Sequence, residues 1–133
     1  MHIPISLSYN ERGKVGTRSL IDCGAQGEFI DKDFAEKNGF PLARLEKPII
    51  ARNVDGTPNK RGTITHYTWA NLQVDNVATK ERLLAVGLGK ENIILGLPWL
   101  KRINPDIDWV KGTLRIGERR GERRTLSAII QQN

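Results

Sequence analysis

The stretch that decides the fold is 19-SLIDCGAQG-27, in which two apolar residues run into an aspartate, the only cysteine of the chain and a turn of small residues. The preceding segment, 14–21, becomes apolar on both faces at its end, which predicts a strand whose last residues are buried. A carboxylate directly after a buried strand, here Asp22, is either a structural turn-former or a reactive acid. Because Asp-x-Gly alone is common, the surrounding sequence has to decide between them.

Strands are predicted on both sides of this stretch. His2 to Tyr9 alternates strictly between apolar and polar residues, which predicts a half-buried strand that forms a hairpin with 14–21 and places Tyr9 on the buried face. A short strand is predicted at 28–30. Further strands are predicted at 48–54, 63–74, 79–88 and in the short apolar run 91–96, which a glycine closes, and a final hairpin is predicted at 107–116.

Two short helices complete the prediction. Asp31 is a good N-cap for DKDFAEKNG, and Gly39 ends that helix. The second helix, LPWLKRIN, has Pro98 in its first turn and ends before Pro105. Roughly eight short strands against two short helices predict an all-β fold.

The length of 133 residues fits one domain, which we expect at 1–117, followed by a basic tail or linker at 118–133. The net charge of +6 is uneven, because 111–124 holds six basic and two acidic residues, or +4 of the +6. This segment is either a solvated tail or a phosphate-binding arm. No aromatic residue stands beside its ERRGERR sequence (118–124) to stack on bases, which disfavours nucleic acid as the partner.

Several function classes are excluded by what the sequence lacks. No run of 18 apolar residues and no signal peptide are present, so we expect neither a membrane span nor secretion. Cys23 cannot form a disulfide within the chain, and His2 and His66 stand alone, so no metal site is expected. These features favour a reducing compartment, and we expect the cytoplasm.

The motifs taken together resemble the retropepsins, the aspartic proteases of retroviruses and LTR retrotransposons. The resemblance rests on 20-LIDCGA-25 and 94-ILG-96, with a hairpin signal between them at Asp55-Gly56. The closer similarity is to proteases of gypsy-type LTR retrotransposons, and it covers about residues 3–117. It is carried by FIDKDFAEKNGFPL (29–42), NVDGTPNKRGTITHY (53–67) and NIILGLPWLKRINPDIDW (92–109).

This resemblance implies a closed-barrel acid-protease fold and an aspartic endopeptidase that processes a retrotransposon polyprotein, in the cytoplasm or within virus-like particles. Aspartic proteolysis needs two carboxylates that share one proton, so that one activates a water and the other protonates the scissile carbonyl. The chain has a single Asp-x-Gly, at Asp22, so the resemblance implies an obligate two-fold homodimer. Neither a metal nor an organic cofactor is implied.

The resemblance also implies roles for other residues. Gly24 supports the active-site loop and lets a substrate backbone approach, Ala25 keeps the floor of the cleft low, and Ile94 lines a pocket for apolar side chains. A hairpin forms the flap that closes over substrate, with its tip at Asp55-Gly56 or at Lys60-Arg61-Gly62. The predicted flap residues in contact with substrate are Asn53, Val54, Asp55 and Gly56.

Cys23 departs from the family pattern. Retropepsins normally have Thr or Ser after the catalytic aspartate, and its hydroxyl bonds across the dimer axis to support the active-site loop; a thiol is a much weaker donor and acceptor. The chain is therefore an active protease with a tolerated substitution, a degenerate or non-catalytic dimerisation or binding module, or a protein in which Cys23 itself is a nucleophile or redox switch. The last is disfavoured, because a cysteine nucleophile needs a base and the chain has two histidines.

Overall fold

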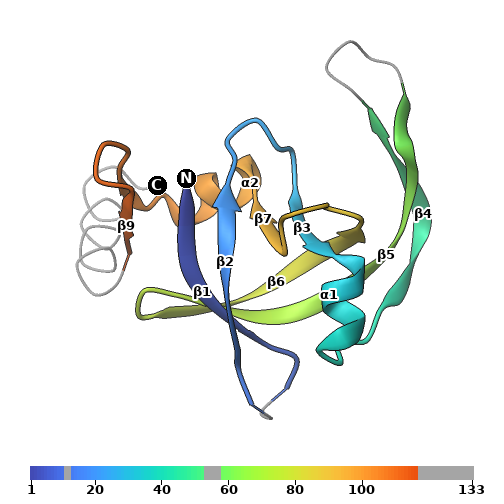
Figure 1. Cartoon of the computed structure of the whole chain (residues 1–133), viewed down its shortest axis with the longest axis horizontal. Coiled ribbons are helices and arrows are strands. Elements are labelled where there is room, and N and C mark those ends of the chain that lie inside the picture. Colours follow the sequence, from blue (N-terminus) through green and yellow to red (C-terminus); the bar gives the residue numbers. More distant parts are fainter. Residues whose placement is uncertain (11–12, 53–57, 117–133) are drawn as a thin grey trace, which may run out of the picture.

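The computed structural model describes residues 1–10, 13–52 and 58–116, and these form nine strands and two helices (Figure 1). The elements are β1 (His2–Ser8), β2 (Val15–Ile21), β3 (Glu28–Asp31), α1 (Lys32–Lys37), β4 (Ala43–Arg52), β5 (Pro58–Val74), β6 (Val77–Val86), β7 (Ile93–Leu95), α2 (Leu97–Ile103), β8 (Asp106–Asp108) and β9 (Thr113–Arg115). The predicted all-β class with two short helices is confirmed.

Six strands close into a barrel. The main sheet has the order β1-β2-β7-β3-β6-β5-β4, and a further pairing of β1 with β5 joins its two ends, leaving β4 outside the closed ring. β2 and β7 are parallel, with Ile21 opposite Leu95, so the residues that follow both strands emerge at the same end of the barrel. Asp22 and Gly96 are therefore neighbours, although they are far apart in the sequence.

The barrel interior is apolar, as the alternation in β1 predicts. Ile3, Ile5 and Leu7 are buried and pack with residues from β3, β5, β6, β7 and α2. Tyr9 was predicted on this buried face, and that prediction is wrong: its side chain is 50% exposed. β1 ends at Ser8, so Tyr9 no longer follows the strand and leaves the interior.

Both helices begin and end as the sequence predicts. The Asp31 carboxylate accepts a hydrogen bond from the Phe34 N–H at 3.1 Å and caps α1, and Gly39 takes a positive φ of 76° just after it. α2 has Pro98 in its first turn and ends at Asn104, which is left-handed at φ 47°. No helix of the described residues is both long enough and apolar enough to cross a membrane.

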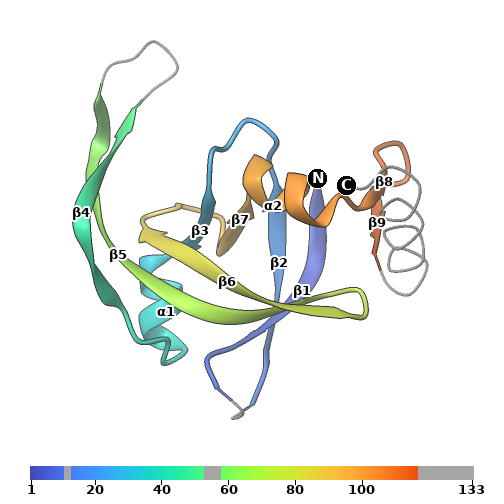
Figure 2. The same cartoon turned by 180° about the vertical axis from the view of Figure 1, so that it is seen from behind.

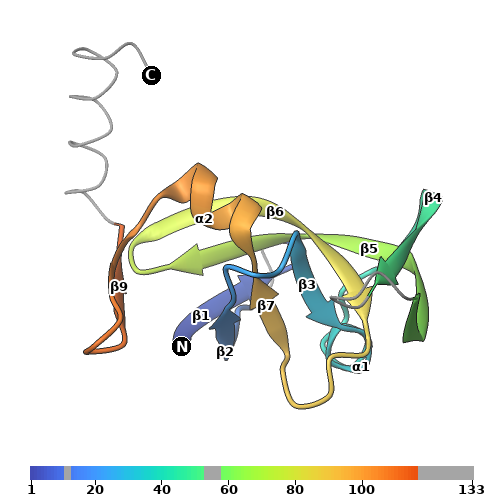
Figure 3. The ribbon, with the colours of Figure 1, turned by 90° about the horizontal axis from the view of Figure 1, so that it is seen from above.

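β4 and β5 form a long hairpin that extends away from the barrel, and Figure 3 shows it at the opposite end of the molecule from β9. Arg52 pairs with Pro58, and Lys60-Arg61-Gly62 lies inside β5. The alternative flap tip at Lys60-Arg61-Gly62 is therefore wrong, because those residues continue the strand instead of reversing it. The remaining candidate, Asp55-Gly56, lies outside the described residues.

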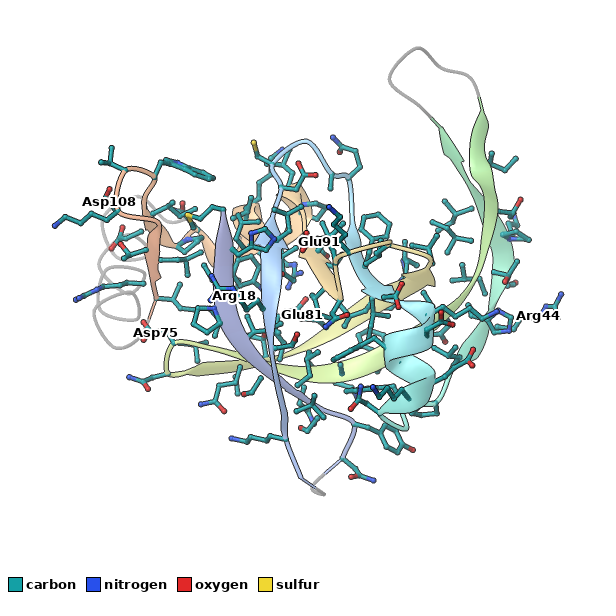
Figure 4. The ribbon with its side chains drawn as sticks, in the orientation of Figure 1. Arg18, Arg44, Asp75, Glu81, Glu91 and Asp108 are labelled. Carbon is teal, nitrogen blue, oxygen red and sulfur yellow. The ribbon has the colours of Figure 1, made fainter. Side chains whose placement is uncertain are left out.

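The predicted final hairpin is formed by β8 and β9, which pair from Asp106 opposite Arg115 to Asp108 opposite Thr113. Asp75, at the β5–β6 turn, accepts a hydrogen bond from the Ile116 N–H and fastens the end of β9 to the barrel (Figure 4). Of the two tryptophans in this part of the chain, Trp99 is buried in the core and Trp109 is 58% exposed.

Candidate active site

The loop between β2 and β3 carries the candidate catalytic residue, and it reaches up beside α2 in the views of Figures 1 and 2. Asp22 continues directly from β2, and its N–H donates to the Leu95 carbonyl at 3.0 Å, so the parallel β2–β7 pairing extends to this residue. Its carbonyl accepts from the Ala25 N–H at 3.0 Å, which closes a tight turn. The backbone of Asp22 is thus fixed on both sides while its side chain stays half exposed.

The Asp22 carboxylate is oriented by the loop itself. Oδ1 accepts a hydrogen bond from the Gly24 N–H at 2.9 Å. A Cβ added at Gly24 would lie 3.2 Å from the same oxygen, which is closer than most side chains tolerate, so glycine gives this N–H room to approach. The arrangement holds one carboxylate oxygen in place and leaves the other available.

Gly96 packs directly against the backbone of the loop. A Cβ on Gly96 would lie 2.6 Å from the Ala25 carbonyl oxygen and even closer to the Gly27 carbonyl oxygen. The neighbouring Leu97 N–H donates to the Ala25 carbonyl at 2.8 Å, so the start of α2 is bonded to the loop. The glycine of the 94-ILG-96 motif is required because the loop backbone rests directly on it.

A cleft of about 920 Å³ opens beside the loop. Its walls are residues 24–29, Ile49, Ile50 and Ile64 of the β4–β5 hairpin, Trp69 of β5, Lys80, Glu81, Arg82 and Leu84 of β6, and Pro98 and Arg102 of α2. Ile49 and Ile50 are exposed apolar side chains that face this cleft from β4. The site can therefore accept an extended peptide with apolar side chains between the loop and the hairpin.

An ionic cluster of two buried glutamates and one half-exposed arginine lies next to the loop. Arg102 donates to both carboxylate oxygens of Glu81, at 2.7 and 3.2 Å, and its guanidinium lies 3.6 Å from the carboxylate of Glu28. Glu28 also accepts from the Trp99 N–H at 3.1 Å, so it caps the start of α2. Glu81 is 2% exposed, and Figure 4 shows it inside the fold. The cluster ties β3, β6 and α2 together at the foot of the loop.

Burial changes the proton affinity of this cluster. The pKa of Glu28 is raised, because desolvation outweighs the hydrogen bond from the Trp99 N–H and the charge of Arg102. The pKa of Arg102 is raised as well, mainly by its hydrogen bonds to Glu81. Arg102 therefore remains charged, and Glu28 binds a proton more tightly than a glutamate in water does.

The structure brings together some of the predicted site residues. Asp22, Cys23, Gly24 and Ala25 share one turn, with Cys23 exposed, and Gly24 and Ala25 line the cleft. Ile94 lies one strand away, between Leu20 and Phe29, and is not among the residues that line the cleft of the single chain. Asn53, Val54, Asp55 and Gly56 lie outside the described residues.

Sequence reasoning missed the cluster of Glu28, Glu81 and Arg102. One signal was available, because Glu81 falls in step with Leu83 and Ala85 along β6, so the alternation places it on the inward face. For Glu28 and Arg102 no local pattern indicated that the two side chains would lie together. Within the described ranges, no group of three or more His, Cys, Asp or Glu residues could hold a metal ion.

Comparisons with known proteins agree with this geometry. The family model described as the PEG10/RTL1 protease domain matches residues 18–124. Among solved structures, the chain is similar to the retroviral protease-like domain of Ddi1 from Leishmania major, with 19% sequence identity, a TM-score of 0.57 and coverage of 88% of each chain. That match shows the retroviral protease-like fold.

Proposed function

The chain belongs to the PEG10/RTL1 protease domain family, which is retropepsin-like and comes from gypsy-derived retrotransposon genes, and from this premise we propose that it is an aspartic endopeptidase that works as a homodimer. The observation that carries the proposal is Asp22. It stands at the end of a buried strand, with its backbone fixed on both sides and one carboxylate oxygen held by Gly24, and it directly precedes the turn whose residues Gly24 and Ala25 line the cleft.

The chemistry follows from pairing two such loops. When Asp22 of one subunit meets Asp22 of the partner subunit on a two-fold axis, the two carboxylates share one proton, because two like charges at that distance cannot both ionise. The ionised carboxylate takes a proton from a water, and the protonated one donates to the scissile carbonyl. Monomers would be inactive. Gly24 would let the substrate backbone approach, and the β4–β5 hairpin would cover it and exclude water.

The substrate follows from the cleft and from the family. The apolar side chains of Ile49, Ile50 and Ile64, with Ile94 next to the scissile bond in the dimer, would select apolar residues in an extended peptide. We propose that this peptide is a polyprotein of the retrotransposon type, cleaved in the cytoplasm or in virus-like particles.

The test compares wild type with the Asp22→Asn variant on an apolar fluorogenic peptide at mildly acidic pH, with a sizing column run in parallel. We expect Asp22→Asn to lower the cleavage rate by at least about a thousandfold, because the amide can neither share a proton nor act as a base. Asp33→Asn, at an exposed position in the first turn of α1, is the matched control and should keep full activity. Retained activity in Asp22→Asn would refute the proposal.

A second candidate function is a dimeric peptide-binding module without turnover. The observation that favours it is Cys23, which replaces the hydroxyl residue expected beside the catalytic aspartate. If wild type and Asp22→Asn bind the peptide equally and neither cleaves it, this candidate is the correct one.

A further inference from the structure

One face of β5–β6 places two cations against two aromatic rings. Trp69 lies opposite Arg82 in the strand register, and Tyr67 lies opposite Leu84, so these side chains share a face. Lys80 Nζ lies 5.5 Å from the centre of the Trp69 ring, and the Arg82 guanidinium lies 5.8 Å from the centre of the Tyr67 ring. Each cation lies diagonally across the two strands from its ring. Tyr67, Trp69, Lys80 and Arg82 therefore form a regular ladder of cations and aromatic rings.

The charges of this ladder are not neutralised by neighbouring carboxylates. Among the described residues, neither Lys80 nor Arg82 forms an ion pair. Glu81, which stands between them in the sequence and also lines the cleft, alternates to the other face of β6, where its carboxylate is paired with Arg102. Both cations are exposed, and Trp69 is 48% exposed. The ladder therefore presents two available positive charges that aromatic rings hold in position.

The ladder belongs to the same cleft as the active-site loop. Trp69, Lys80 and Arg82 line the cleft that Gly24 and Ala25 also line, and Leu84 connects the two regions along β6. A peptide that lies extended over the loop advances about 3.3 Å per residue, so its flanking residues continue toward this end of the cleft. The positive charges would thus meet substrate side chains some distance from the scissile bond.

We propose that Trp69, Lys80 and Arg82 form a subsite for an acidic side chain, Asp or Glu, of the bound peptide. This subsite rests on the proposed function and adds a charge requirement to the apolar preference at the centre. A two-fold dimer carries the subsite twice, once at each end of the cleft. Lys80 and Arg82 supply the charge, and the Trp69 ring covers the aliphatic part of the ligand and keeps Lys80 directed toward it.

The experiment measures binding, so it can be read whether or not the protein cleaves. Asp22→Asn protein is titrated into labelled ten-residue peptides with an apolar centre, in which a single Glu or its isostere Gln is placed at each position in turn. We expect one position, with its symmetry mate, where Glu binds roughly fivefold more tightly than Gln, as for a partly exposed charge pair. This preference should weaken as salt is added.

Two double variants locate the effect. Lys80→Glu with Arg82→Glu should remove the preference for Glu and favour a Lys-containing peptide. The control, Arg44→Glu with Lys90→Glu, makes the same change in net charge at exposed positions that do not line the cleft, and Figure 4 shows Arg44 pointing outward from β4. It should keep the preference. If charge reversal impairs folding, Lys80→Gln with Arg82→Gln should still lose the Glu preference.

Three results would overturn the proposal: no position that prefers Glu, a preference that survives changes at Lys80 and Arg82, or an equal loss in the Arg44 and Lys90 control. A single-stranded oligonucleotide is titrated as well. If the Lys80 and Arg82 variant loses oligonucleotide binding while its peptide preference is unchanged, the ladder is a nucleic-acid surface instead. Failure of the proposed function gives a different pattern, namely discrimination between Glu and Gln without cleavage by wild type.

Discussion

Two carboxylates stand at the two ends of the same loop and differ in almost every physical respect. Asp22 follows β2, has a half-exposed side chain, and accepts a hydrogen bond from the loop backbone at Gly24. Glu28 begins β3, is buried, caps α2 through the Trp99 N–H, and lies near the guanidinium of Arg102. The first is available to solvent and substrate, and the second is enclosed by the fold.

Under the proposed function, the difference separates a residue placed for chemistry, Asp22, from a residue placed for structure, Glu28. A carboxylate that activates water has to reach water, so it cannot be neutralised by a cation of its own chain. A carboxylate that orders a loop is most effective when it is enclosed and bonded to several elements, even though burying its charge costs free energy. Glu28 connects β3, α2 and the cluster of Arg102 and Glu81, and so it holds the loop that carries Asp22.

The largest expected effect comes from Gly96, which lies under the loop between the two carboxylates. In Gly96→Ala the new Cβ would collide with the carbonyl oxygens of Ala25 and Gly27, and these are backbone atoms that cannot move aside without displacing the loop. We expect the free energy of unfolding to fall by about 3 kcal/mol, the upper end of the range for overpacking. Urea denaturation monitored by circular dichroism measures this loss.

The control for this change is Gly16→Ala on β2, where a Cβ would meet no atom within 4 Å. It should leave the free energy of unfolding within about 0.5 kcal/mol of wild type, as for an ordinary surface substitution. A Gly96→Ala protein as stable as the Gly16→Ala protein would show that the loop does not rest on Gly96.

The next effect tests the enclosed side of the comparison. Arg102→Ala removes the only guanidinium of the cluster and leaves Glu81, which is 2% exposed, without its two hydrogen bonds. We expect a loss of about 2 kcal/mol, below the full value for breaking a buried ion pair because Arg102 itself is half exposed. Lys101→Ala, at the adjacent exposed position of α2, should be nearly neutral, and an equal loss there would indicate a general effect on the helix.

The sequence predicted the exposed end of the loop far better than the enclosed end. The position of Asp22 at the end of a buried strand could be predicted because its signal is local: a buried strand, a carboxylate and small residues in succession. The strands, both helix boundaries and Asp31 as N-cap followed from alternation and capping for the same reason.

Contacts between residues that are distant in the sequence could not be predicted from local patterns. Glu28 and Arg102 are 74 positions apart, and only the barrel closure brings β3, β6 and α2 together. Likewise, position 96 requires glycine because of carbonyl groups that lie about 70 residues earlier in the chain. Lys60-Arg61-Gly62 was a local turn signal that the tertiary structure overrode, because these residues lie within β5, between Pro58 and Thr63, which both pair with β4.

A smaller effect is expected from the titration of Glu28. Because burial raises its pKa from the ordinary value of 4.5, the folded protein binds this proton more tightly than the unfolded chain does. Between pH 4.5 and the raised pKa the folded state holds more protons, so the contribution of Glu28 to stability decreases as the pH rises through that window. Glu28→Gln keeps an acceptor for the Trp99 N–H and cannot titrate, so its stability should decline less from pH 4.5 toward neutrality.

Denaturation midpoints of wild type and Glu28→Gln, measured from pH 4 to pH 8, give the two slopes. Glu36→Gln, at an exposed position of α1, serves as the matched control and should follow the wild-type slope. A steeper decline in Glu28→Gln than in wild type would mean that the charge of Arg102 dominates over burial, and that Glu28 is stabilised in its ionised form.

The smallest expected effect on the stability of the monomer comes from a change at Cys23. The same change should nevertheless alter dimerisation or catalysis. This side chain is exposed, so Cys23→Ser should leave the unfolding free energy of the monomer within about 0.5 kcal/mol of wild type. In the proposed dimer the new hydroxyl could donate and accept across the axis, where the thiol does so weakly. We therefore expect a several-fold lower dimer dissociation constant or a higher turnover number, measured by sedimentation equilibrium and peptide cleavage, with Cys23→Ala as the control that gains neither. If Cys23→Ser changes neither quantity, the residue beside Asp22 does not limit the site, and the weakness assigned to the thiol is wrong.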